Sequence, residues 1–116
     1  MREDSTQAPV VGPSTGSDGE LVVAARSGRR EAFDVLTERY FGMVYAIAYA
    51  RLTHRDSAED LAQEVFLRAY LLLDRLENPQ TFCAWIGRIT RNLATDWQRH
   101  STRVARILSP EPLDTS

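Results

Sequence analysis

The segment from Phe82 to Arg106, FCAWIGRITRNLATDWQRHSTRVAR, has the periodicity of one long amphipathic helix. At about 100° per residue, its apolar face consists of Phe82, Ile86, Ile89, Leu93 and Trp97. Its opposite face gathers Arg88, Arg91, Asn92, Thr95, Arg99, Arg103 and Arg106. Such a helix can pack its apolar face on a bundle and present the other face to a polyanion. On this pattern alone, an ordinary solvated face is an equally good interpretation.

The distribution of charge favours the interpretation that this face binds a polyanion. All fourteen basic residues are arginine, and the formal net charge of the chain is −2. Residues 1–87 carry nine arginines against thirteen acidic residues, whereas residues 88–106 carry five arginines against Asp96 alone. The basic residues are therefore concentrated on the long helix, and a local cluster of this kind indicates an acidic partner better than the overall charge does.

The composition is that of one soluble globular domain. The chain has 116 residues, of which 43% are hydrophobic and 26% charged. No apolar run approaches the roughly 20 residues that cross a bilayer, and no apolar core of a signal peptide appears at the N-terminus. One cysteine, Cys83, and two isolated histidines give neither an internal disulfide nor a metal site. We expect no metal and no cofactor, and a cytoplasmic location.

Helical periodicity continues through the rest of the chain. Residues 1–17 are predicted to be a disordered leader, followed by a short helix capped by Asp18. Long helices are expected at about 30–52 and 58–76, the second capped by Asp56 or Ser57. Asn78 and Pro79 signal the start of the helix described above. The predicted fold is an all-α bundle of three long helices and one short N-terminal helix.

Two clusters of residues carry functional information. Asp60, Gln63, Glu64 and Leu67 lie near one face of their helix, a mixture suited to docking on a basic protein surface or, alternatively, a solvated first turn. Trp85 borders the arginine face, where a ring can stack on unpaired bases. The alternative is a tryptophan in the core. No Gly-rich phosphate loop and no nucleophile beside a base is present, so we expect no enzyme.

Taken together, three segments resemble region 2 of bacterial sigma factors of the extracytoplasmic-function (ECF) group. They are ELVVAARSGRREAFDVLTERY at 20–40, AEDLAQEVFLRAY at 58–70 and FCAWIGRITRNLATDWQR at 82–99. The resemblance implies binding to the clamp helices of the RNA polymerase β′ subunit through Asp60, Gln63, Glu64, Phe66 and Leu67. It also implies recognition and melting of the −10 promoter element, with the non-template strand on Arg88, Arg91, Asn92, Thr95 and Arg99. From their places on the arginine face and at its border, Arg103 and Trp85 join the predicted DNA-binding residues. A pocket for one extruded base would be bordered by Leu76, Glu77, Asn78, Gln80 and Thr81.

The resemblance also sets the expected domain limits and the competing functions. Region 2 would span residues 18–106, and residues 107–116 would begin a linker to a second, −35-reading domain that this sequence does not contain. The loop lacks the Gly-Asp-Ser of many relatives, so their base preference does not carry over. One alternative is a module of the same fold that acts mainly through an anti-sigma protein or polymerase. Another is a helical scaffold.

Overall fold

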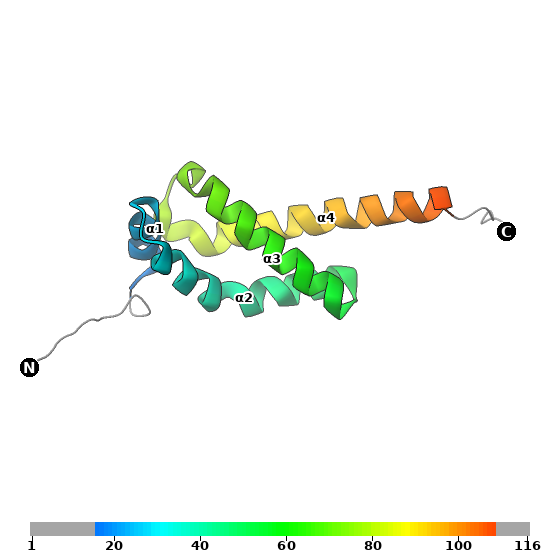
Figure 1. The fold of residues 1–116 in the computed structure, drawn as a ribbon, viewed down its shortest axis with the longest axis horizontal. Coiled ribbons are helices and arrows are strands. Elements are labelled where there is room, and N and C mark those ends of the chain that lie inside the picture. The colour runs from blue at the N-terminus through cyan, green and yellow to red at the C-terminus, as the bar shows by residue number, and fades with distance from the viewer. Residues whose placement is uncertain (1–15, 109–116) are drawn as a thin grey trace, which may run out of the picture.

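Four α-helices, one short and three long, form the part of the chain that the computed structural model describes, residues 16–108 (Figure 1). They are α1 (Asp18–Arg26), α2 (Arg30–Leu52), α3 (Arg55–Leu72) and α4 (Phe82–Leu108). Two 3₁₀ turns, η2 (Leu73–Arg75) and η3 (Pro79–Thr81), lie in the connection between α3 and α4. The all-α prediction is confirmed. Most of the predicted leader, and residues 109–116 of the predicted linker, lie outside the described residues.

The helix starts differ from the predicted ones in their capping residues. The N-cap of α1 is Ser17, not Asp18, and Ser17 forms a reciprocal capping box with Glu20. The N-cap of α3 is His54, whose side chain makes no capping hydrogen bond. Asp56 lies inside the first turn of α3, where a carboxylate stabilises the helix through its dipole and not as a cap.

The helix ends differ as well. The helix predicted at 58–76 ends as an α-helix at Leu72. The next three residues form the 3₁₀ turn η2, which begins the loop to α4. Asn78 caps the 3₁₀ turn η3 through a hydrogen bond from the Gln80 amide, and α4 follows at Phe82. At its other end α4 runs two residues past the predicted limit, to Leu108.

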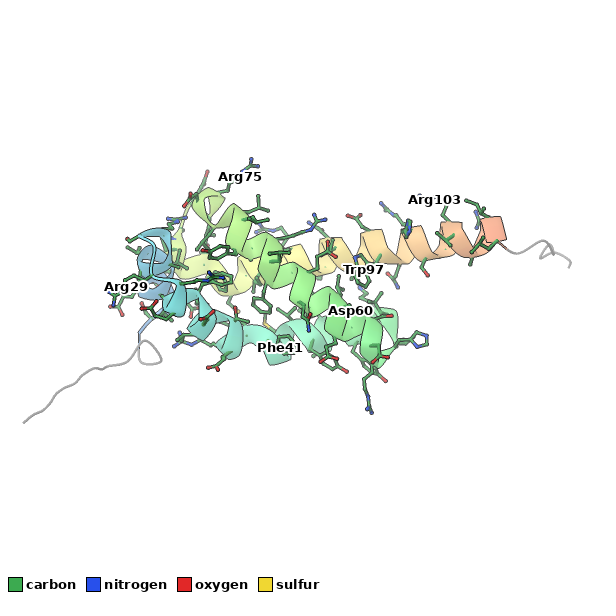
Figure 2. All side chains as sticks on the ribbon, in the orientation of Figure 1. Arg29, Phe41, Asp60, Arg75, Trp97 and Arg103 are labelled. Carbon is green, nitrogen blue, oxygen red and sulfur yellow. The ribbon has the colours of Figure 1, made fainter. Side chains whose placement is uncertain are left out.

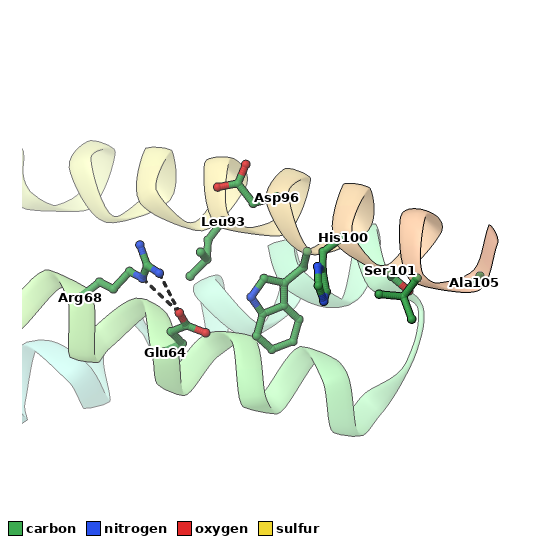
Figure 3. A pocket seen from close by; sticks show the side chains of 9 residues that line it. Glu64, Arg68, Leu93, Asp96, His100, Ser101 and Ala105 are labelled. Carbon is green, nitrogen blue, oxygen red and sulfur yellow. Dashed lines mark hydrogen bonds and ion pairs between the residues drawn. The ribbon is translucent and has the colours of Figure 1, made fainter. Parts of the chain in front are cut away.

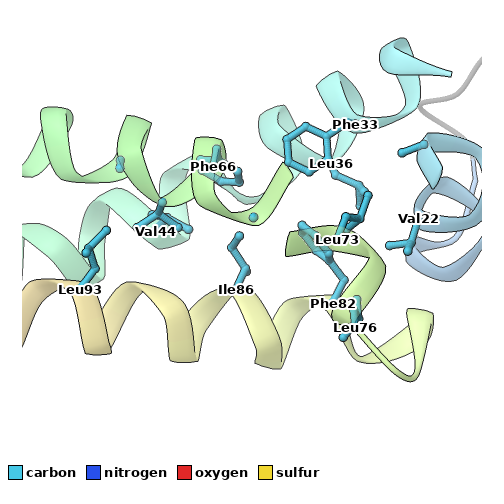
Figure 4. Close-up of a cluster of buried hydrophobic side chains, with 14 of the residues drawn as sticks. Val22, Phe33, Leu36, Val44, Phe66, Leu73, Leu76, Phe82, Ile86 and Leu93 are labelled. Atoms are coloured by element: carbon cyan, nitrogen blue, oxygen red, sulfur yellow. The ribbon is translucent and has the colours of Figure 1, made fainter. Parts of the chain in front are cut away.

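The hydrophobic core lies between α2, α3 and α4, and α2 packs against each of the other three helices. Phe82, Ile86 and Leu93 of the predicted apolar stripe are buried, while Ile89 and Trp97 are partly buried at its edge. Figure 4 shows Leu73 and Leu76 of the loop entering the same core beside Val22 of α1. The loop is therefore held by its own apolar side chains as well as by its backbone.

The distal part of α4 extends beyond the ends of α2 and α3 (Figure 1). Arg103 projects from this extension, whereas Arg75 lies at the opposite end of the bundle, near α1 (Figure 2). Ile107 and Leu108 at the tip are about three-quarters exposed. Among residues 16–108, no helix has the length and apolarity needed to cross a membrane.

Candidate nucleic-acid interface

The outer face of α4 exposes the predicted arginines. Arg88, Arg91, Asn92, Arg99 and Arg103 are all exposed, and the buried side of the same helix lies in the core. At 1.5 Å per residue, Arg88 and Arg103 lie about 22 Å apart along the helix axis. An arginine-rich face of this length suits an extended run of phosphates, since guanidinium groups bind phosphate oxygens in a fork geometry.

Thr95 does not belong to this free face. Its hydroxyl accepts a hydrogen bond from Nη1 of Arg51 at 2.9 Å and donates to the carbonyl of Arg91 at 3.0 Å. One turn further, the side-chain amide of Gln98 donates to the Arg51 carbonyl at 2.9 Å. Thr95 therefore joins α4 to the end of α2, and its hydroxyl is already engaged. The prediction that Thr95 contacts the DNA strand did not take this hydrogen bond between α4 and α2 into account.

A pocket of about 310 Å³ opens where the loop meets the first turns of α4. Trp85 forms part of its wall, half-buried, with its ring 5.9 Å from that of Phe82. The lining residues are Arg75, Leu76, Glu77, Asn78, Thr81, Ala84, Trp85 and Arg88. Four of the five predicted loop residues thus border one pocket. Arg75 directly precedes the named loop residues, within the loop 74–81 that the resemblance places at the pocket, whereas Ala84 of α4 was not predicted.

Gln80, the fifth predicted loop residue, faces the other way. Its side-chain Oε1 accepts a hydrogen bond from the backbone amide of Gly19 at 3.2 Å. Gln80 lines a separate depression between α1 and η3 and does not line the pocket beside Trp85. The prediction that Gln80 borders the base pocket is therefore wrong, because α1 draws this side chain to the back of the loop.

The loop is also closed by its own hydrogen bonds. The Asn78 side chain accepts from the Gln80 amide, and the Asn78 carbonyl accepts from both the amide (2.9 Å) and the hydroxyl (2.7 Å) of Thr81. The Leu76 amide bonds to the Leu73 carbonyl at 3.2 Å. These bonds give the short loop a defined backbone, which a pocket of fixed shape requires.

The second predicted surface lies on α3. Asp60, Gln63 and Leu67 are exposed, and Leu67 presents 59% of its surface. Glu64 is partly buried at the edge of this face and pairs with Arg68 at 3.1 Å, one helical turn away. Asp60, Gln63 and Leu67 are thus available to a partner, and Glu64 is available in part.

Phe66 is not available to a partner. Only 5% of it is exposed, and its ring stacks on that of Phe41 at a centroid distance of 6.1 Å. The predicted direct contact of Phe66 with polymerase does not fit this burial, which arises because α3 buries a wider face than the expected stripe when it packs against both α2 and α4. Phe66 supports the exposed residues on either side of it.

A larger groove, about 720 Å³ in volume, separates α3 from the distal half of α4. Figure 3 shows Glu64 and Arg68 of α3 on one side and His100 of α4 on the other, and Trp97 also lines the groove. Its base is apolar, formed in part by Leu93. Neither in this groove nor in any other part of residues 16–108 do three His, Cys, Asp or Glu side chains come together in a way that could hold a metal ion.

Residues 36–104 match the Sigma-70 region 2 family, and the chain belongs to that family. It is 40% identical over 90 residues to a probable RNA polymerase sigma factor, RfaY, of Xanthomonas campestris pv. campestris, covering 78% of this chain and 22% of that protein. It is 32% identical over 114 residues to the ECF RNA polymerase sigma factor SigE of Mycolicibacterium smegmatis, covering 97% of this chain and 44% of that one. The chain spans less than half the length of either curated relative.

A solved structure shares the fold. The NMR structure of an engineered region 2 of sigmaE in complex with GTAAAA superposes with a TM-score of 0.70 at 29% identity. The match covers 81% of this chain and 95% of that one. The resemblance to ECF sigma factors is thereby confirmed, and the family is not enzymatic, as predicted.

Proposed function

We propose that this chain is the part of an ECF sigma factor that recognises the −10 promoter element as a separated strand and docks on core RNA polymerase. The observation that carries the proposal is the pocket beside Trp85, because it opens directly onto the exposed arginine face of α4. Recognition of one unpaired strand requires both features, a hollow for a base and cations for the phosphates. The sigmaE relative bound to GTAAAA supports the same assignment.

On this proposal, one base leaves the stack and enters the pocket. Taking a base out of a duplex costs a few kcal/mol, and stacking on an aromatic ring returns about 1–3 kcal/mol. Trp85 supplies such a ring in the pocket wall. Arg88, Arg91, Arg99 and Arg103 neutralise phosphates on either side, while the amide of Asn92 pairs with a base edge through its donor and acceptor.

Polymerase docking uses the exposed residues of α3. Asp60, Gln63 and Leu67 combine a carboxylate, an amide and an apolar group on one face. Charged groups set the orientation of a protein complex, and desolvated apolar groups supply much of its affinity. The partner that the family implies is the pair of clamp helices of the β′ subunit. We place this interaction in the cytoplasm.

The proposal is tested with the hexanucleotide GTAAAA and its single-base variants. We expect the 116-residue chain to bind GTAAAA more tightly than variants altered at the recognised positions. Asn92→Ala should reduce discrimination at one position by roughly 5-fold, the effect of losing one base-edge contact. Arg99→Gln serves as the comparison, because loss of a phosphate contact weakens all sequences alike. Equal binding of all hexanucleotides by the unaltered chain would refute promoter recognition.

A further inference from the structure

The loop between α3 and α4 has a second side, turned away from the pocket and toward α1. Its front carries Asn78 and Thr81 into the pocket wall. Its back is held by two polar contacts, one from each end of α1. Neither contact belongs to the surface proposed for DNA.

The first contact is made by Arg26, the last residue of α1. Its guanidinium donates to the Leu73 carbonyl through Nε at 3.2 Å and through Nη2 at 2.8 Å, and Nη2 also donates to the Leu76 carbonyl. These carbonyls lie at the ends of α3 and η2, where the helix dipole is negative, and the Leu73 carbonyl also accepts from the Leu76 amide. Arg26 therefore fixes the backbone on both sides of η2, from which Arg75 and Leu76 enter the pocket wall.

The second contact joins Gly19 to Gln80. The Gly19 amide donates to Oε1 of Gln80 at 3.2 Å, and the backbone of α1 approaches the side chain so closely that a Cβ at this position would displace it. A Cβ at position 19 would overlap Nε2 and Cδ of Gln80. Because these atoms are the far end of a flexible side chain, an added methyl group would displace Gln80 without breaking the fold.

Helix α1 is in turn fixed to the bundle. The carboxylate of Asp18 accepts from Nη1 of Arg39 at 2.8 Å and from the hydroxyl of Tyr40. Burial, together with the hydrogen bond to Asp18, raises the pKa of the Tyr40 hydroxyl well above its usual range. The Tyr40 ring lies 5.7 Å from the ring of Phe82, the first residue of α4. One continuous set of contacts therefore connects α2, α1, the loop and the pocket.

We infer that α1 sets the base selectivity of the pocket from behind, with Arg26, Gly19 and Gln80 acting as positioning residues. This inference rests on the proposed function, because it concerns the same pocket. Residues 18–26 lie outside the segment matched to the family, 36–104, so the family match itself assigns them no role. None of the three lines the pocket, so we expect them to act through the position of the loop and not through contact with the base.

The test compares Gly19→Ala with Gly42→Ala in the 116-residue chain. Both glycines lie inside helices, where alanine is the better residue, but a Cβ at Gly42 meets nothing within 4 Å. We expect Gly19→Ala to lower discrimination at one position of the GTAAAA variants by roughly 5-fold, with thermal unfolding at or above that of the unaltered chain. Gly42→Ala should leave the discrimination unchanged.

Further variants separate positioning from simple structural damage. Gln80→Ala should lower discrimination at the same position, and Gly19→Ala added to Gln80→Ala should change nothing more, because no side-chain amide remains to displace. Arg26→Ala should act at that position too, with partial recovery in Arg26→Lys. A chain that discriminates among the hexanucleotides equally with and without Gly19→Ala would overturn the inference and leave the proposed function standing. An unaltered chain that does not discriminate would overturn both.

Discussion

Removal of a single charge from the arginine face should change how salt weakens the binding of DNA. Each phosphate neutralised on a single strand contributes about −0.7 to the slope of log K against log salt. Four exposed arginines, Arg88, Arg91, Arg99 and Arg103, face the proposed strand. We therefore expect a slope of about −2.8, or a loss of about 50-fold in affinity between 50 and 200 mM salt. For Arg99→Gln the slope should fall to about −2.1 and the loss to about 18-fold.

The assay is fluorescence anisotropy with labelled GTAAAA at a series of NaCl concentrations. Arg55→Gln is the matched control, because Arg55 is an exposed arginine at the start of α3 and its loss changes the net charge equally. The control should keep the slope of the unaltered chain. A slope near zero for the unaltered chain, or equal slopes for Arg99→Gln and Arg55→Gln, would refute the assignment of the α4 face to phosphates.

Two further predictions concern α3 and the core. Gln63→Ala combined with Glu64→Ala should abolish binding to a β′ clamp-helix fragment in a pull-down, with little loss of stability, since the Glu64–Arg68 pair at the surface is worth only about 0.3–0.5 kcal/mol. Glu38→Ala on α2 is the control, and binding retained by the double variant would contradict the assignment of this α3 surface to polymerase. Ile86→Ala should lower the free energy of unfolding by about 2–5 kcal/mol in urea denaturation, because Ile86 is fully buried beneath the arginine face. A loss below about 1 kcal/mol would contradict the packing of α4 on the core.

The sequence predicted those features that depend on residues close together in the chain. The period of Phe82, Ile86 and Leu93 placed α4 and its buried face correctly. The Asn78-Pro79 pair, predicted to start this helix, starts the 3₁₀ turn η3 that leads into α4 at Phe82, because an N-cap followed by proline is a local signal for either kind of helix. The arginine face followed from the same period, since it is the complement of the buried stripe.

Contacts between distant segments could not be predicted in this way. Phe66 is buried because two helices cover α3, and a periodicity count on α3 alone does not contain that information. The hydrogen bonds from Arg26 join residues 47 and 50 positions apart, and nothing near Arg26 in sequence indicates them. Thr95 has the spacing of the exposed face but binds Arg51, 44 positions away. In each case tertiary packing decided the role of the side chain.

The unbroken helix α4 limits how the length of this segment can vary among related chains. One continuous helix carries Trp85, Asn92, Arg99 and Arg103. The angles between these side chains around the helix axis therefore depend only on the number of intervening residues. Deleting one residue after Asn92 would turn both distal arginines by about 100° around the axis. Inserting seven residues would return them to within about 20° of their direction but shift them by about 10 Å. Chains that bind the same strand should therefore differ here by substitution and not by single insertions or deletions.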